Sequence, residues 1–93
     1  MNQSSKLLIR VLVKPGCPPC NISTYVVKKL NLKYDFDMKM INIRERKYKQ
    51  YADYCNRLPL IFIGDDFIME GKINEREIAE KLEELNVEKI QQA

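Results

Sequence analysis

The chain has 93 residues, of which 45% are apolar and 31% are charged, so it is long enough for one compact domain and too short for two. This composition excludes a disordered chain, and a formal net charge of +3 without a zinc-finger, helix-turn-helix or RNA-recognition signature does not favour a nucleic-acid binder. No apolar stretch approaches the ~20 residues that cross a bilayer and no secretory leader is visible, so we expect a cytoplasmic protein that binds neither nucleic acid nor membrane.

The first two predicted elements are a buried strand and the helix that follows it. Residues 7–13 form a nearly continuous run of apolar, branched side chains, which is typical of a strand covered on both faces of its sheet. Pro15 and Gly16 end this strand. From Pro18 onward the apolar residues recur at helical spacing, which predicts a helix. Its inward-facing side chains are predicted to be Ile22, Tyr25, Val26 and Leu30.

A second strand and a second helix are predicted in the middle of the chain. Residues 38–43 are expected to form the strand, and residues 46–56 the helix. One side of this helix is predicted to carry Tyr48, Tyr51, Ala52 and Cys55. The densest basic run of the chain, residues 44–49, lies at the start of this helix, and we interpret it as a solvated surface.

The last third of the chain predicts a hairpin and a closing helix. Residues 60–63 and 67–69 are two short apolar strands, and the three residues between them include Gly64, which fits an antiparallel hairpin. Asn74 and Glu77 have the spacing of a capping box, which marks the start of a helix. Its inward stripe is predicted to be Ile78, Leu82 and Leu85. Residues after Val87 are expected to fray.

Together these elements predict one α/β domain with the order βαβαββα. A βαβ unit places its two strands parallel, and the hairpin adds an antiparallel strand at one edge. We therefore expect a four-stranded mixed sheet with helices on both faces, formed by residues 6–86, with tails at residues 1–5 and 87–93. We expect the domain to be a monomer.

The motif that carries chemistry is Cys17-Pro18-Pro19-Cys20, which lies between the predicted buried strand and the start of the helix. Free amides and the helix dipole at such a position stabilise a thiolate, which is the nucleophile of disulfide exchange. We therefore predict that Cys17 attacks a substrate disulfide and that the more enclosed Cys20 resolves the mixed disulfide. Lys14 either adds positive potential beside the thiolate or is a solvated lysine.

Other roles for the cysteines fit the composition less well. A structural zinc site needs four Cys or His ligands, whereas the chain has three cysteines and no histidine, so no metal site is predicted, although a cluster bridging two subunits stays open. The odd number of cysteines argues against a secreted disulfide framework and fits a reducing compartment. The third cysteine, Cys55, is interpreted as a small buried hydrophobe, with a regulatory or glutathionylated thiol as the alternative.

The pattern Lys14-Pro15-Gly16-Cys17-Pro18-Pro19-Cys20, followed by Leu58-Pro59 before a strand–turn–strand–helix ending, resembles glutaredoxins and small thioredoxin-like proteins. The resemblance covers residues 6–86 and implies a thioredoxin-like fold in which the Leu58-Pro59 bond is cis and borders the active site. Glutaredoxins carry a lysine three positions before a C-P-x-C motif, and the chain matches both features. The second proline of the motif matches thioredoxins instead, whereas Gly16 and Val11 stand where thioredoxins have a tryptophan and a buried acid.

The same resemblance implies glutathione as electron donor, with no tightly bound cofactor, and disulfide-containing proteins and glutathione as partners. The substrate- and glutathione-binding residues that it implies are Lys14, Pro18, Pro19, Leu58, Pro59, Gly71, Lys72 and Asn74. The chain departs from glutaredoxins in two places. Arg57-Leu58-Pro59 replaces T-V-P, and residues 69–74 replace the Gly-Gly-x-Asp-Asp segment that holds the γ-glutamyl end of glutathione.

Three functions stay open at this point. The chain is a glutaredoxin-like reductase of protein disulfides or glutathione mixed disulfides, as Lys14 and the C-P-x-C motif indicate. Alternatively it is a thioredoxin-like protein reductase recycled by a flavoprotein reductase, which Pro19 and the missing glutathione-site residues favour. The third alternative is a non-catalytic binding module on the same fold, against which the intact cysteine pair argues.

Overall fold

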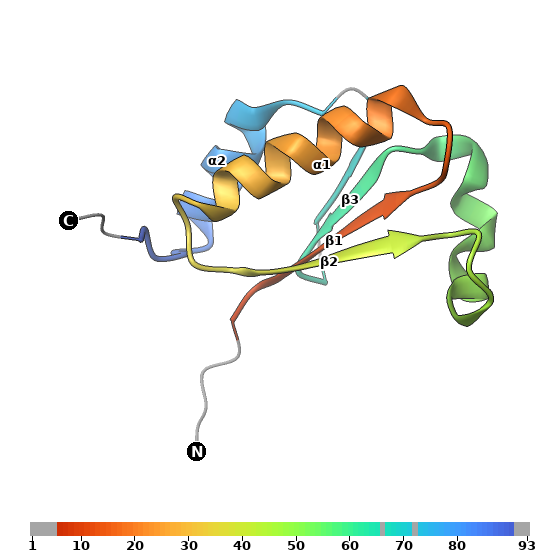
Figure 1. The fold of residues 1–93 in the computed structure, drawn as a ribbon. Helices are drawn as coiled ribbons and strands as arrows, with labels where there is room; N and C mark the ends of the chain where they lie inside the picture. Colours follow the sequence, from red (N-terminus) through yellow and green to blue (C-terminus); the bar gives the residue numbers. More distant parts are fainter. Residues whose placement is uncertain (1–5, 66, 72, 91–93) are drawn as a thin grey trace, which may run out of the picture.

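The computed structural model describes residues 6–65, 67–71 and 73–90, which form a layered α/β structure (Figure 1). The elements in chain order are β1 (Leu8–Val13), α1 (Pro18–Asn31), β2 (Asp37–Asn42), the 3₁₀ helix η1 (Arg46–Arg57), β3 (Leu60–Ile63), β4 (Phe67–Glu70) and α2 (Glu75–Glu84). Every predicted strand is present, and this confirms the order βαβαββα.

The four strands form a mixed sheet in the order β2-β1-β3-β4, with β2 and β4 outermost. β1 is parallel to β2, and α1 makes the crossover that a parallel pair requires. β3 is antiparallel to both β1 and β4. The predicted four-stranded mixed sheet is therefore confirmed.

The strand register brings four chain segments to one edge of the sheet, which we call the site edge. Val13, at the end of β1, pairs with Asn42 at the end of β2. Beside it, Leu12 pairs with Leu60 at the start of β3, and Leu60 pairs with Glu70 at the end of β4. The segments that follow β1, β2 and β4 therefore meet the segment that precedes β3.

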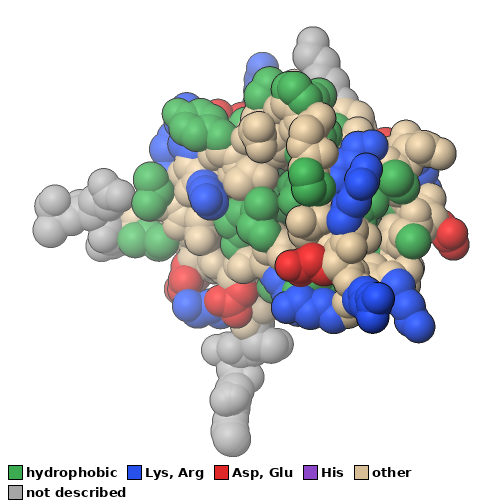
Figure 2. Space-filling view, turned by 45° about the vertical axis from the view of Figure 1, so that its right-hand side comes forward, with side chains coloured by type: hydrophobic (Ala, Val, Ile, Leu, Met, Phe, Trp, Pro, Cys, Tyr) green, Lys and Arg blue, Asp and Glu red, His purple; other side chains and the backbone are tan. Residues whose placement is uncertain are grey.

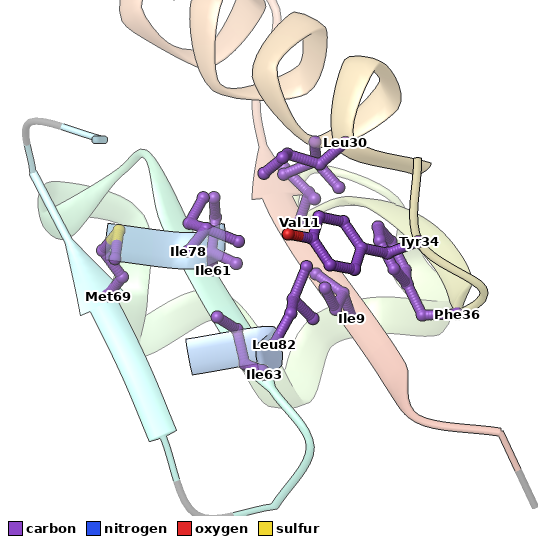
Figure 3. Close-up of a cluster of buried hydrophobic side chains, with 11 residues drawn as sticks. Ile9, Val11, Leu30, Tyr34, Phe36, Ile61, Ile63, Met69, Ile78 and Leu82 are labelled. Atoms are coloured by element: carbon purple, nitrogen blue, oxygen red, sulfur yellow. The ribbon is translucent and has the colours of Figure 1, made fainter. Parts of the chain in front are cut away.

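The main hydrophobic core lies between the sheet and the two α-helices, which pack side by side on one face (Figures 1 and 3). Side chains alternate between the two faces of a strand, so every second residue of β1 and β3 points into this core. The core contains Ile9, Val11, Ile61 and Ile63 from the central strands and Val27, Leu30, Ile78 and Leu82 from the helices. All eight side chains are buried.

η1 covers the opposite face, which confirms helices on both faces of the sheet. The intervening strand residues lie on this face and, with Ile43 directly after β2, form a second core of Leu12, Ile41, Ile43, Leu60 and Phe62. Arg10 also points to this side. Its guanidinium lies over the Phe62 ring, 4.8 Å from the centroid, and donates a hydrogen bond to the Tyr51 hydroxyl at 3.0 Å. Stacking on the Phe62 ring and the hydrogen bond to Tyr51 let a charged side chain occupy this half-buried position.

The helical period of η1 differs from the prediction, although its bounds agree with it. η1 is kinked at Tyr48, whose φ of −112° and ψ of 24° are not helical. Tyr48, Tyr51 and Tyr54 are spaced by three residues, the length of one 3₁₀ turn, and the three rings follow one another along one side. Neighbouring ring centroids are 6.3 and 6.4 Å apart. The 3.6-residue period placed Ala52 on this side, which is wrong because Ala52 is exposed. Cys55 is half-buried and packs against the second core, as predicted.

The buried face of α1 also differs from the prediction. Ile22 and Tyr25 are 62% and 65% exposed, whereas Val26 and Leu30 do face the core, so half of the predicted stripe is wrong. The residues buried in α1 are Cys20, Ser23, Val27 and Leu30. Ser23 is fully buried because its hydroxyl donates a hydrogen bond to the Cys20 carbonyl at 2.8 Å, which satisfies a polar group inside the core.

The last described residues, which follow α2, are bonded to the segment between α1 and β2. Leu85 forms the C-cap of α2 and is 42% exposed, so the predicted inward stripe consists of Ile78 and Leu82 alone. Beyond α2, Glu88 accepts a hydrogen bond from the backbone of Asp35, and Ile90 donates one to Lys33, both at 2.8 Å. Backbone hydrogen bonds therefore join Glu88 and Ile90 to the segment between α1 and β2, and the fraying of residues after Val87 stays a prediction. The predicted tail residues 1–5 and 91–93 lie outside the described residues.

Candidate active site

Cys17 and Cys20 form a disulfide at the site edge, where β1 leads into α1. Cys17 is the N-cap of α1, and its Cα lies 5.2 Å from that of Cys20, within the ~4.4–6.8 Å usual for disulfides. Gly16 has a φ of +72°, in the left-handed region that favours glycine, and this turn redirects the chain from strand to helix. The predicted position of the pair at a strand-to-helix junction is confirmed.

The Cys17 sulfur faces the first backbone N–H of the helix, which also donates to the Cys17 carbonyl at 3.0 Å. Pro18 and Pro19 fill the first two helical positions and have no N–H group, so Cys20 supplies the first backbone donor of α1. This N–H donates a hydrogen bond to the Cys17 Sγ at 3.2 Å. In the reduced protein the same donor and the positive end of the helix dipole are placed to stabilise a Cys17 thiolate.

Cys17 and Cys20 differ in solvent exposure and in the hydrogen bonds that hold their backbone. Cys17 is 9% exposed and Cys20 is 1% exposed, which is the order expected for an attacking and a resolving thiol. The Cys20 carbonyl accepts hydrogen bonds from the hydroxyls of Ser23 at 2.8 Å and Thr24 at 2.9 Å. These two residues were not among the predicted site residues. A sequence signal for them exists: a serine or threonine three or four positions after a helical residue can donate its hydroxyl to the carbonyl of that residue.

Pro59 lies at the site edge, directly before β3. The Leu58-Pro59 bond is cis, which confirms what the family resemblance implies. Because Leu12 pairs with Leu60, this bond lies beside the end of β1, from which the chain leads to Cys17. The buried Pro59 accepts a hydrogen bond through its carbonyl from the Gly71 N–H at 3.1 Å. Gly71 has a φ of +80°, so a glycine is required for this turn.

An ion pair joins the two segments that carry Pro59 and Gly71. Arg57 donates two hydrogen bonds to Glu70, from Nε to Oε2 at 3.0 Å and from Nη2 to Oε1 at 2.6 Å. This bidentate geometry fixes the planes of both groups. The sequence analysis did not predict this pair. Arg57 just before β3 and Glu70 at the end of β4 are opposite charges, and the register of the hairpin brings them together.

We predict that acid breaks this pair at a pH below the ordinary glutamate range. The hydrogen bonds from Arg57, and then its charge, lower the pKa of Glu70. Because the folded-state pKa is depressed, the pair contributes to stability above the unfolded pKa of glutamate, and this contribution is lost as the pH falls through the lowered pKa. An NMR titration of the Glu70 carboxyl carbon measures this value. The variant Arg57→Gln should return the pKa toward that of a free glutamate, and an unchanged titration would contradict the assignment.

The structure brings most of the implied substrate-binding residues to the site edge. Lys14 is half-buried directly after β1, and the exposed Pro18 and Pro19 begin α1. Leu58 is half-buried beside Pro59, opposite Gly71. Lys72 lies outside the described residues. The binding roles of these residues remain predictions.

Asn74 is the N-cap of α2, as the capping-box pattern predicts, and this affects any anion bound there. Its Oδ1 accepts hydrogen bonds from the N–H groups of Arg76 at 2.9 Å and Glu77 at 3.3 Å. A helix start binds an anion through its free amides, and Asn74 already occupies two of them. Glu75 and Glu77 add negative charge in the first turn. A carboxylate of glutathione would have to displace the Asn74 oxygen at this position.

The part of the chain that the structure describes holds neither a cluster of metal ligands nor a membrane-spanning helix. Within residues 6–65, 67–71 and 73–90, no three Cys, Asp or Glu side chains come together as metal ligands. Within the same ranges, no helix has the length and apolar character needed to cross a membrane.

Comparisons with solved structures show that the fold is thioredoxin-like. A mutant thioredoxin from Halobacterium salinarum NRC-1 is 19% identical, with a TM-score of 0.71 over 86% of this chain and 74% of that one. Thioredoxin O2 from Arabidopsis thaliana, in its oxidised state, is 20% identical, with a TM-score of 0.68 over 87% and 76%. A reduced thioredoxin pre-protein from Schistosoma mansoni is 15% identical, with a TM-score of 0.64 over 86% and 79%.

Sequence comparisons identify the family. A search of curated protein sequences gives no match. The model of the family described as Glutaredoxin-like domain (DUF836) matches residues 8–83, which is most of the chain and includes both cysteines of the pair. A thioredoxin-like fold with Cys17 and Cys20 at disulfide distance supports a thiol–disulfide oxidoreductase. The chain belongs to the glutaredoxin-like domain family (DUF836).

Proposed function

We propose that this protein reduces disulfides of other proteins, or mixed disulfides of glutathione, through Cys17 as nucleophile and Cys20 as resolving thiol. The observation that carries the proposal is the hydrogen bond from the Cys20 N–H to the Cys17 sulfur at the start of α1. It supports a stabilised thiolate at the more exposed of the two cysteines.

The proposed reaction is a pair of thiol–disulfide exchanges. The Cys17 thiolate attacks one sulfur of the substrate disulfide, forming a mixed disulfide and releasing the other sulfur as a thiolate, which takes up a proton. Cys20 then loses its proton and attacks the Cys17 sulfur, which releases the second substrate thiol. Two electrons pass to the substrate, and the protein is left with the Cys17–Cys20 disulfide seen in the structure.

We further propose that glutathione is the reductant. The protein is proposed to be a cytoplasmic monomer. One glutathione thiolate opens the Cys17–Cys20 disulfide, and a second releases oxidised glutathione and the dithiol. A flavoprotein reductase is the second candidate donor, because the capped and acidic start of α2 makes carboxylate binding there less favourable.

A comparison of the two donors tests the proposal. The oxidised protein is mixed either with reduced glutathione or with NADPH and a thioredoxin reductase, and turnover is followed with a model glutathione mixed disulfide and with insulin. Turnover supported by glutathione is expected. Turnover with the flavoprotein reductase alone would favour the second candidate, and no turnover with either donor on either substrate would contradict the proposed reduction.

We expect the Cys17 thiol of the reduced protein to have a pKa below the ~8.5 of a free cysteine, because a helix amide donates to its sulfur. The helix start contributes first, and the nearby Lys14 second. Thiolate absorbance, titrated in a Cys20→Ser, Cys55→Ser variant, measures this pKa. A value at or above that of a free cysteine would contradict the proposed role of the helix start.

A further inference from the structure

The positive charge of this protein is concentrated in one segment. Residues 39–49 contain five Lys or Arg residues and one acidic residue, a formal charge of +4, so the rest of the chain carries −1. All five cationic side chains are exposed, and we call them the basic patch: Lys39, Arg44, Arg46, Lys47 and Lys49. The overall net charge of +3 averages this segment with a nearly neutral remainder and therefore conceals the concentration.

The fold gathers the basic patch on the η1 side of the sheet. Lys39 of β2 and Lys47 of η1 both lie over the ring of Tyr48, with their Nζ atoms 5.5 and 5.2 Å from its centroid. One aromatic ring therefore joins the cations of the strand to those of the helix. The backbone from residue 44 to residue 49 spans at most about 18 Å. In Figure 2, where the right-hand side of Figure 1 with η1 comes forward, Lys and Arg side chains gather in the lower right part of the view.

The carboxylates of the protein do not neutralise the basic patch. Within residues 6–65, 67–71 and 73–90 six ion pairs form, and none of them includes a member of the patch. Glu45, the acidic residue of the same segment, is exposed and takes part in none of these pairs. Cations without counter-charges favour a ligand with several closely spaced negative charges, because its binding releases condensed counterions.

The side chains of η1 indicate which polyanion fits. The centre of a protein interface is apolar and aromatic, and a helix that lies in a membrane surface exposes an apolar face. The tyrosines of η1 pack against the second core, and none of the large apolar side chains exposed in the described residues belongs to η1. A nucleic acid needs no apolar contact, because its phosphate backbone supplies sequence-independent binding. With one phosphate per ~3.4 Å of a strand, about five phosphates lie along the length of the patch.

We propose that the basic patch binds the phosphate backbone of nucleic acids without preference for base sequence. Its Lys and Arg side chains donate charge-assisted hydrogen bonds to the phosphate oxygens. This binding is a second function beside the proposed disulfide reduction and does not depend on it, since none of the five side chains is a candidate active-site residue. It replaces the expectation, drawn from the net charge alone, that the protein binds no nucleic acid.

The test measures binding of labelled DNA of about 12 nucleotides, single-stranded and duplex, by fluorescence anisotropy at about 50 mM salt. The patch variant combines Arg44→Gln, Arg46→Gln and Lys49→Gln. Within the described residues these three side chains make no ion pair, side-chain hydrogen bond or ring contact, so the variant is expected to fold as the native chain does. An unchanged Tm checks this.

A control variant removes the same charge from the other face of the sheet. It combines Lys28→Gln, Lys33→Gln and Arg76→Gln, which are exposed positions in α1, directly after α1 and in α2. The comparison separates the position of the charges from the net charge of the protein, which is equal in the two variants.

The patch variant should weaken DNA binding at least about 10-fold and lower the slope of log Kd against log salt by about 2, since each lost phosphate contact removes ~0.7–0.9. The control variant should stay within about three-fold of the native protein, and probes of different base sequence within about two-fold of one another. Absence of binding to both probes, equal losses in the two variants, or tighter binding to polyglutamate or to anionic phospholipid vesicles than to DNA would overturn the proposal. The patch variant should still reduce bis(2-hydroxyethyl) disulfide at the native rate. Failure of the native protein to reduce any disulfide would overturn the proposed function and leave the nucleic-acid site standing.

Discussion

Replacing Cys17 by serine should abolish disulfide reduction, with a rate at least about a thousandfold lower, because a serine hydroxyl is a far weaker nucleophile than a thiolate at neutral pH. Replacing Cys20 by serine should instead stop the reaction halfway, since Cys17 still attacks but no second thiol releases the adduct. Mass spectrometry under non-reducing conditions should show the Cys20→Ser protein joined to its substrate through one disulfide.

Cys55→Ser is the matched control for both cysteine variants. Cys55 is half-buried on η1 and packs against the second core, on the opposite side of the sheet from α1. Its replacement should preserve activity. Loss of activity in Cys55→Ser, or a stable adduct in Cys17→Ser, would show that the nucleophile has been misassigned.

Leu82→Ala should destabilise the fold by about 3 kcal/mol, within the usual ~2–5 kcal/mol for a buried leucine. Leu82 is fully buried in the main core between α2 and the sheet, so its removal leaves a cavity as well as losing apolar contact (Figure 3). For a domain of this size each kcal/mol shifts Tm by about 4–8 °C, so Tm should fall by more than about 10 °C. Urea unfolding of the oxidised protein gives the free energy directly.

Leu85→Ala is the control within the same helix. Leu85 is 42% exposed at the end of α2, one turn after Leu82, and its truncation creates no cavity. The loss should stay below about 1 kcal/mol. Comparable losses at both positions would mean that α2 is rotated relative to the sheet.

β1 and β3 were predictable because their residues are almost all apolar and turn-forming residues follow them. Residues 60–63 are Leu-Ile-Phe-Ile, and all four are buried, as expected for a central strand packed on both faces. The turn at Gly64 and the N-cap at Asn74 follow from the conformations that these residue types prefer. Such local signals do not depend on tertiary contacts.

The buried faces of the helices were harder to predict. The spacing of apolar side chains identifies a buried face only when no polar side chain is buried there and no large apolar one is exposed. In α1, Ser23 is buried by bonding to its own helix, while Ile22 and Tyr25 face solvent. In η1, a tyrosine at every third position was visible in the sequence, but the shorter 3₁₀ period that aligns the rings was not assumed.

At the site, the cysteine pair and its helix position were predictable from the motif, and the cis bond at Leu58-Pro59 from the family resemblance alone. The Arg57–Glu70 pair depends on strand register, which joins residues 13 positions apart. The bond from Cys20 to the Cys17 sulfur depends on the exact backbone of the N-cap. Distant pairing and cap geometry both need three-dimensional coordinates.

The two outer strands determine how this sheet meets other molecules. An unpaired strand edge is a template for aggregation unless it is short or charged. β4 has four residues and ends at Glu70, which is held by Arg57, and β2 carries the exposed charges of Asp37 and Lys39. Extending the sheet by another chain would bring that chain against these charges. Both edges therefore disfavour fibril-like growth, and encounters with other proteins are directed to side-chain surfaces instead of the exposed backbone.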